Sequence, residues 1–185
     1  MRHALQQIKI ADIPDTEISF DTPSLAGYAN GNCTTSACRV FNPSGGGMVY
    51  MIPAVHDWLD PAQSASPLYG QWYFPARVCV VGVGSGVAGC RSDGVDNESL
   101  LIVLPWVKKD ICIAINDKLG IPCPGNVPPT QAANAWPATN PKFTGTYADG
   151  AELDLGGLRT GCFEGSAGNT PPDKTYTFFQ VLLAR

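Results

Sequence analysis

Seven cysteines in a chain of 185 residues are the strongest constraint on what this protein can fold into. Six of them form three pairs that are close in sequence and the seventh stands near the C-terminus: Cys33 and Cys38, Cys79 and Cys90, Cys112 and Cys123, then Cys162. Disulfides persist in oxidising compartments, and those that close short loops hold small domains together. The spacing therefore predicts a disulfide-stapled domain in a bacterial periplasm, on a cell surface or outside the cell.

The connectivity of the disulfides is only partly fixed by the sequence. We expect Cys33–Cys38 and Cys79–Cys90, because the first pair flanks a polar turn and the second a glycine-rich one. A third bridge ties Cys112 to either Cys162 or Cys123, and spacing alone leaves that choice open.

Zinc binding is the competing explanation for so many cysteines. Structural zinc sites favour pairs of ligands two residues apart, and no CxxC sequence occurs here. The two histidines, His3 and His56, do not stand near a cysteine. The cysteine pattern therefore favours disulfides over a metal.

The composition indicates one compact domain over residues 1–185. The chain is 44% hydrophobic and only 15% charged, with 20 glycines and 16 prolines, which predicts short strands and many turns around a sizeable core. Its net charge of −4 gives no electrostatic basis for binding a phosphate backbone. We expect no nucleic acid as a partner.

The middle of the chain predicts a buried strand followed by a helix. The longest apolar run, residues 100–107, is much shorter than the roughly 20 residues that cross a bilayer as a helix. After it, a helix is expected over about residues 106–119, with Gly120 ending it. One face of this helix is apolar and should pack on a sheet; it consists of Val107, Ile111, Ala114, Ile115 and Leu119.

Further strands are expected at 71–83, which is rich in aromatic and β-branched residues, and at 176–183. Short strands separated by Gly and Pro turns suit hairpins better than parallel crossovers. The predicted fold class is therefore α+β: an antiparallel sheet with one packed helix, rich in loops and stapled by disulfides.

A GxGxxG match at Gly84, Gly86 and Gly89 raises the possibility of a dinucleotide site. That fingerprint needs a helix directly after it, with its N-terminus on the pyrophosphate. Turn-forming residues follow instead, so a glycine-rich hairpin closed by Cys79 and Cys90 is the better interpretation.

The N-terminal residues 2–10 carry apolar residues at helical spacing, and Pro14 ends the pattern. No signal peptide is visible at Met1, although an exported chain needs an address. We therefore expect a trimmed form, in which residues 1–10 are the end of a longer helix.

Three segments of the second half carry a family resemblance. LLIVLPWVKKDICIAINDKLGI at 100–121, CFEG at 162–165 and the terminal YTFFQVLLAR at 176–185 resemble the globular part of bacterial prepilin-type proteins. These are the type IV pilins and type II secretion pseudopilins. Such proteins combine a long N-terminal helix with an antiparallel sheet, and many close their C-terminal region with a disulfide.

The resemblance implies a structural subunit, such as a minor or tip subunit, of a pilus or pseudopilus acting in adhesion, secretion or uptake. Its partners would be other pilin-like subunits. Membrane contact would come through an apolar N-terminal helix that this sequence lacks, and no catalysis would be expected.

Particular residues suggest two other classes of function. A secreted module that binds carbohydrate or protein would use an aromatic platform at Trp72, Tyr73 and Phe74, although strand alternation places at least one of the three in the core. A small secreted hydrolase would depend on His56 beside Asp57, with Asp60 nearby. Adjacent residues rarely converge on one substrate, so the hydrolase is the weaker alternative.

Calcium is the one cofactor that the residues suggest. Asp93, Asp96, Asn97 and Glu98 place four oxygen-bearing side chains within six residues, and calcium takes six to eight oxygens. Some pseudopilins bind calcium in a loop near their C-terminal strands. The segment lacks EF-hand spacing, and a solvated acidic turn is the competing explanation.

Overall fold

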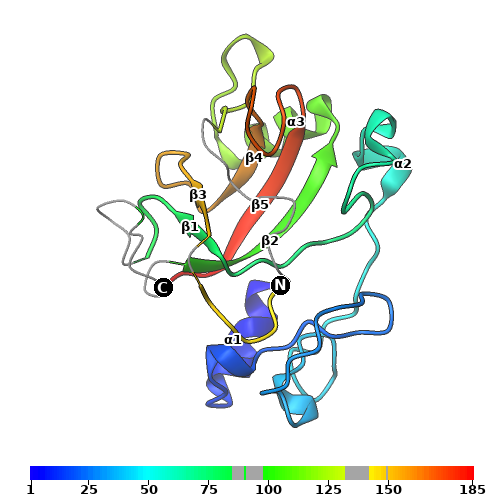
Figure 1. Cartoon of the computed structure of the whole chain (residues 1–185), viewed down its shortest axis with the longest axis vertical. Coiled ribbons are helices and arrows are strands. Elements are labelled where there is room, and N and C mark those ends of the chain that lie inside the picture. The colour runs from blue at the N-terminus through cyan, green and yellow to red at the C-terminus, as the bar shows by residue number, and fades with distance from the viewer. Residues whose placement is uncertain (85–89, 91–97, 132–141, 149) are drawn as a thin grey trace. The chain divides into compact units, whose positions relative to one another are not determined.

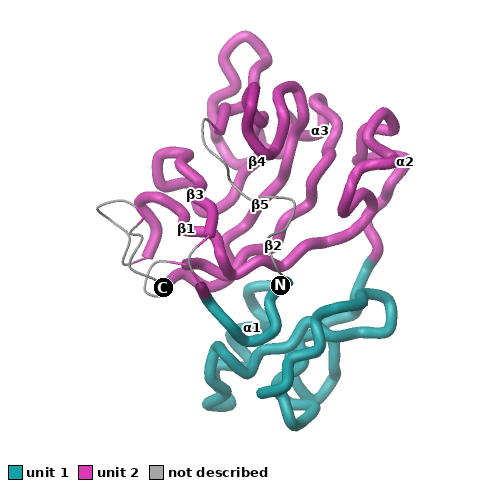
Figure 2. Tube along the Cα trace, viewed as in Figure 1, with its two compact units in different colours: residues 1–51, 141–147 teal, residues 52–140, 148–185 magenta. Residues whose placement is uncertain are grey.

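The computed structural model describes residues 1–84, 90, 98–131, 142–148 and 150–185 (Figure 1). The chain divides into two compact units, Met1–Met51 with Pro141–Tyr147 and Ile52–Asn140 with Ala148–Arg185 (Figure 2). We call them unit 1 and unit 2. The chain was expected to form a single domain over residues 1–185, and that expectation stays a prediction.

Unit 2 contains a five-stranded sheet. Its strands are β1 (Val78–Val80), β2 (Glu98–Val107), β3 (Ala151–Leu153), β4 (Thr160–Glu164) and β5 (Tyr176–Leu183), in the order β3-β1-β2-β5-β4. The antiparallel pairs are β1–β2, β2–β5 and β4–β5, but β3 runs parallel to β1. The sheet is therefore mixed, and a purely antiparallel sheet was the wrong expectation. The long connection from β1 to β3, which contains β2 and a helix, allows the parallel crossover.

The strand predicted over 71–83 is much shorter in the structure. Only Val78–Val80 forms a regular strand, while Tyr73 makes an isolated bridge with Val103. Pro75 stands between them; it has no N–H to give to a ladder, although its carbonyl accepts from the N–H of Leu101 at 3.0 Å.

Helix α3 (Lys109–Leu119) begins later than the expected residue 106. Trp106 and Val107 still belong to β2, where Trp106 has a φ of 65° at an irregularity in the pairing with β5. The helical face that packs most deeply also differs from the prediction: Cys112 and Asn116 are fully buried, whereas Leu119 is exposed. The contacts of Cys112 and Asn116 with β4 explain this rotation.

Asn116 ties α3 to the edge strand β4. Its Nδ2 donates to the carbonyl of Cys162 at 2.8 Å, and its Oδ1 accepts from the N–H of the same residue at 2.8 Å. The side-chain amide therefore takes the place of a neighbouring strand at this position. An exposed strand edge is a template for unwanted pairing, and this contact covers it.

Gln131 connects the two edges of the sheet. Its main-chain N–H donates to the carbonyl of Glu164 in β4 at 2.9 Å. Its side chain donates to the carbonyl of Glu152 in β3 and accepts from the N–H of Asp154, both at 3.0 Å. The sheet must therefore curl until both edge strands reach one buried residue, as in a partly closed barrel.

One face of the curled sheet forms the core of unit 2. Val103, Phe163 and Phe179 are fully buried there, with the rings of Phe163 and Phe179 edge to face at 6.0 Å. Register places Gly161 opposite Phe179 on this face. A Cβ at Gly161 would lie 2.9 Å from Cδ1 of Ile121, so a larger residue here would require the Ile121 side chain to shift.

Unit 1 contains α1 (Arg2–Ile10), which confirms the helix expected over residues 2–10. Its buried face is Ala4, Leu5 and Ile8. Lys9 near its end forms an ion pair with Asp15. That α1 is the end of a longer helix remains a prediction.

Replacing Asn116 with alanine should cost about 2–3 kcal/mol of stability, because the N–H and carbonyl of Cys162 would lose their partners in a buried site. Urea denaturation measures this free energy of unfolding. The matched control is Asp117→Ala, an exposed position on the same helix, which should stay within about 0.5 kcal/mol of the parent. Equal effects of the two changes would contradict the edge-capping role.

Candidate functional site

A row of side chains crosses the outer face of the sheet, opposite the core face. Register pairs Leu104 of β2 with Phe178 of β5, and Phe178 with Cys162 of β4. The antiparallel bridge between Tyr73 and Val103 extends the row by placing Trp72 beside Leu104. Four segments far apart in sequence thus contribute to one apolar stripe.

Trp58 reaches this stripe from α2 (Val55–Trp58). The residue after it, Leu59, bridges antiparallel to Val107. The N–H of Asp60 donates to the carbonyl of Trp106 and the N–H of Lys108 donates to that of Trp58, both at 2.8 Å. Leu59 is fully buried, whereas Trp58, the last residue of the helix, is left 39% exposed.

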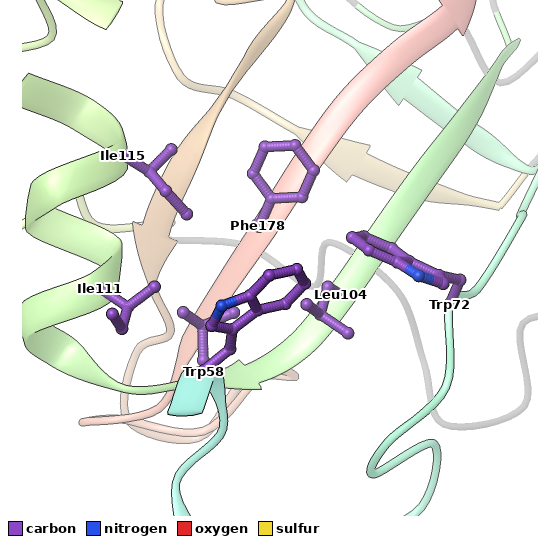
Figure 3. Close-up of a pocket in the computed structure, with 7 residues that line it drawn as sticks. Trp58, Trp72, Leu104, Ile111, Ile115 and Phe178 are labelled. Carbon is purple, nitrogen blue, oxygen red and sulfur yellow. The ribbon is translucent and has the colours of Figure 1, made fainter. Parts of the chain in front are cut away.

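Helix α3 forms the wall of the site. Cys112 on the helix is bonded to Cys162 on β4, which fixes the helix against the sheet (Figure 1). Ile111 and Ile115 flank this attachment and project toward Phe178 (Figure 3). They are half-buried rather than part of the core, so the predicted apolar face of the helix forms the side of a pocket.

The result is an apolar pocket of about 340 Å³. Its lining is Trp58, Trp72, Leu104, Val107, Ile111, Ile115 and Phe178 (Figure 3). Leu104 and Val107 form a buried floor. The rings of Trp72 and Phe178 meet edge to face at 6.3 Å, which holds both partly exposed aromatics in place.

The side chains that line this pocket are almost entirely apolar. None of them carries a charge, and their polar atoms are the indole nitrogens of Trp58 and Trp72. Such a surface favours an apolar or aromatic group, because burial removes apolar area from water on both sides.

The aromatic platform predicted at residues 72–74 is divided between two environments. Trp72 lines the pocket, whereas Tyr73 and Phe74 are buried, so the expectation that at least one of the three is core is confirmed. Burial raises the pKa of the Tyr73 phenol well above its usual range, with the charge of Arg77 opposing the shift.

The structure contains the three disulfides Cys33–Cys38, Cys79–Cys90 and Cys112–Cys162. Cys123, the alternative partner in the sequence, is a free thiol beside Asn116. Its Sγ lies 3.4 Å from Nδ2 of Asn116. The three bridges indicate an oxidising environment.

The possible hydrolase residues do not converge on a site. His56 and Asp57 are exposed neighbours on α2, while Oδ1 of Asp60 accepts from the N–H of Ala62 at 3.0 Å and caps a short 3₁₀ turn. None of the three residues lines the apolar pocket.

The suggested calcium ligands Asp93, Asp96 and Asn97 lie outside the described residues, as do Gly86 and Gly89 of the glycine-rich match. Glu98 is described: it is the first residue of β2 and is 2% exposed, not part of a solvated turn. Among the described residues, no three acidic, histidine or cysteine side chains gather as a metal site.

Comparisons of the chain with protein-family models, with curated proteins and with solved structures found no match. In the part of the chain that the structure describes, no helix is both long and apolar enough to cross a membrane. The site must therefore be interpreted from its own geometry.

Sequence reasoning missed Trp58 and Phe178 as site residues. The cross-strand register that unites them with Trp72 depends on pairings among distant segments. One local signal was present: the strand at 176–183 has three aromatic residues among eight, and its alternate residues must face away from the core.

We expect alkaline pH to destabilise the protein through Tyr73. The folded state raises the pKa of this phenol above the unfolded value of about 10, so its contribution is present below pH 10 and is lost as pH rises further. The loss is limited to about 1.4 kcal/mol per pH unit. Denaturation at pH 9, 10 and 11 should show a flatter decline for Tyr73→Phe than for the parent. Tyr69→Phe, at a half-buried tyrosine, is the control, and parallel declines for all three proteins would refute the assignment.

Proposed function

We propose that the chain is a non-catalytic structural subunit of a bacterial pilus or pseudopilus, acting in adhesion, secretion or uptake. Its apolar pocket receives an apolar side chain from a neighbouring pilin-like subunit. The observation that carries the proposal is this pocket, which leaves Trp58, Trp72 and Phe178 partly open to solvent in one place.

The composition of the pocket supports protein binding. Interface hot spots are enriched in aromatic residues held in well-packed, charge-poor depressions. Trp58 sits at the mouth over the buried floor of Leu104 and Val107, which is the arrangement of a socket for one protruding side chain. Rigid walls reduce the ordering cost of binding, and the Cys112–Cys162 bridge supplies that rigidity.

The remaining support comes from architecture. The Cys112–Cys162 bridge closes the C-terminal part of the chain, a feature that the pilin resemblance implies. Three disulfides suit a periplasmic or extracellular filament. Assembly through a shared helical core would require an apolar helix upstream of α1, and the upstream sequence of the native gene tests that requirement.

Placing a charge in the pocket should prevent incorporation into filaments. Ile115→Asp would bury a carboxylate against an apolar partner and lower the amount of the chain in the sheared filament fraction by about tenfold or more. The matched control is Ala114→Asp, an exposed position on the same helix. Both proteins are first compared by thermal melting, so that loss of fold is separated from loss of assembly.

A photo-cross-linking experiment provides a direct readout. Benzoylphenylalanine at position 58 should form ultraviolet-dependent adducts with another pilin-like subunit in the native cell, whereas the same residue at Val127, exposed elsewhere on unit 2, should not. Unchanged filament yield of Ile115→Asp together with no adduct at position 58 would refute the proposed socket.

The volume of the pocket favours one alternative function, a secreted module that binds an apolar small molecule. About 340 Å³ is at the lower end of the roughly 300–1,000 Å³ range of ligand sites. In that case anilinonaphthalene sulfonate should bind the folded protein with a saturable rise in fluorescence, and Ile115→Asp should weaken binding about tenfold while Ala114→Asp leaves it unchanged. Equal probe binding by all three proteins would exclude the pocket as the ligand site.

A further inference from the structure

Unit 1 contains a second hollow that differs from the apolar pocket in its chemistry. Its volume is about 350 Å³, and it is lined by Asp21, Thr22, Pro23, Arg39, Phe41 and Asn42. Opposite charges, a hydroxyl, an amide and an aromatic ring thus surround one depression.

The local fold brings these residues together from two segments. Ser19 bridges parallel to Arg39, with the N–H of Ser19 donating to the carbonyl of Cys38 at 3.0 Å and the N–H of Val40 donating to that of Ser19 at 2.9 Å. Because the two segments run the same way, residues 21–23 and 41–42 leave the ladder at the same end. The Cys33–Cys38 disulfide directly before Arg39 restricts the second segment.

Phe41 is held as a partly exposed platform. Val40 is fully buried, so alternation turns Arg39 and Phe41 to the other side. The Phe41 ring meets Phe20 edge to face at 6.3 Å and Tyr50 at 5.3 Å. These contacts fix the ring before any ligand arrives, which lowers the ordering cost of binding.

The polar groups of the hollow are available for a ligand. Within the described part of the chain, Asp21 and Arg39 line the same hollow without forming an ion pair with each other. The Oδ1 atom of Asn42 accepts from the N–H of Ser44 at 2.9 Å, which fixes the side chain and leaves its amide N–H groups as donors.

We propose that this hollow binds a neutral saccharide. An anionic ligand would be repelled by Asp21 and a cationic one by Arg39, whereas neighbouring hydroxyls can donate to the carboxylate and accept from the guanidinium at the same time. A sugar ring also has an apolar face that stacks on an aromatic side chain such as Phe41. The site belongs to unit 1 alone and does not depend on the function of the apolar pocket.

An array of neutral, sialylated and sulfated glycans tests the class of ligand, with saturation-transfer-difference NMR on free glycans to detect weak binding. We expect neutral glycans to bind. Arg39→Gln and Asp21→Asn should each weaken binding about tenfold, because each removes a charge-assisted hydrogen bond. The matched control is Arg159→Gln, which changes an exposed arginine of unit 2 and should leave binding unchanged.

Two further outcomes would overturn the proposal. Binding restricted to acidic glycans, lost in Arg39→Gln but unaffected by Asp21→Asn, would identify an anion site. Failure of every glycan to bind the folded parent protein would remove the saccharide site altogether. Both substitutions are at solvent-accessible side chains, and thermal melting of each variant verifies that unit 1 still folds.

Discussion

The attachment of α3 to strand β4 is the constraint on which the apolar pocket of unit 2 depends. The Cys112–Cys162 bond and the two hydrogen bonds of Asn116 act on the same residue of β4, one on its side chain and the other on its backbone. Together they fix the rotation of the helix as well as its distance from the sheet. In this rotation, Ile111 and Ile115 stay half-buried at the side of the pocket.

The two candidate sites share one structural arrangement. In each, a disulfide lies close to the site, and an isolated bridge pairs the segment that carries the aromatic residue with another segment. Leu59 and Val40 face inward so that Trp58 and Phe41 remain partly open. The difference lies in the surroundings: only apolar groups surround Trp58, whereas unlike charges accompany Phe41.

The sequence predicted what depends on local patterning. Helix 2–10, the strand at 176–183 and the helix near 106–119 each follow from apolar periodicity and turn residues. The parallel β1–β3 pairing and the late start of α3 depend on tertiary hydrogen bonds that no local pattern encodes. The sequence identified Trp72 as a candidate site residue. Its contact with Phe178 could not be predicted, because it depends on how β2 pairs with β5 on one side and with the segment around Tyr73 on the other.

The position of Gln131 bears on how this protein can join others. Many filaments and amyloid-like assemblies grow when a free sheet edge accepts a strand from another chain. Here β3 and β4, the two outermost strands, already give backbone groups to the same residue, and Asn116 occupies a further stretch of β4. Strand exchange at those positions would first have to displace Gln131, whose main chain bonds β4 and whose side chain bonds the β3 end of the sheet.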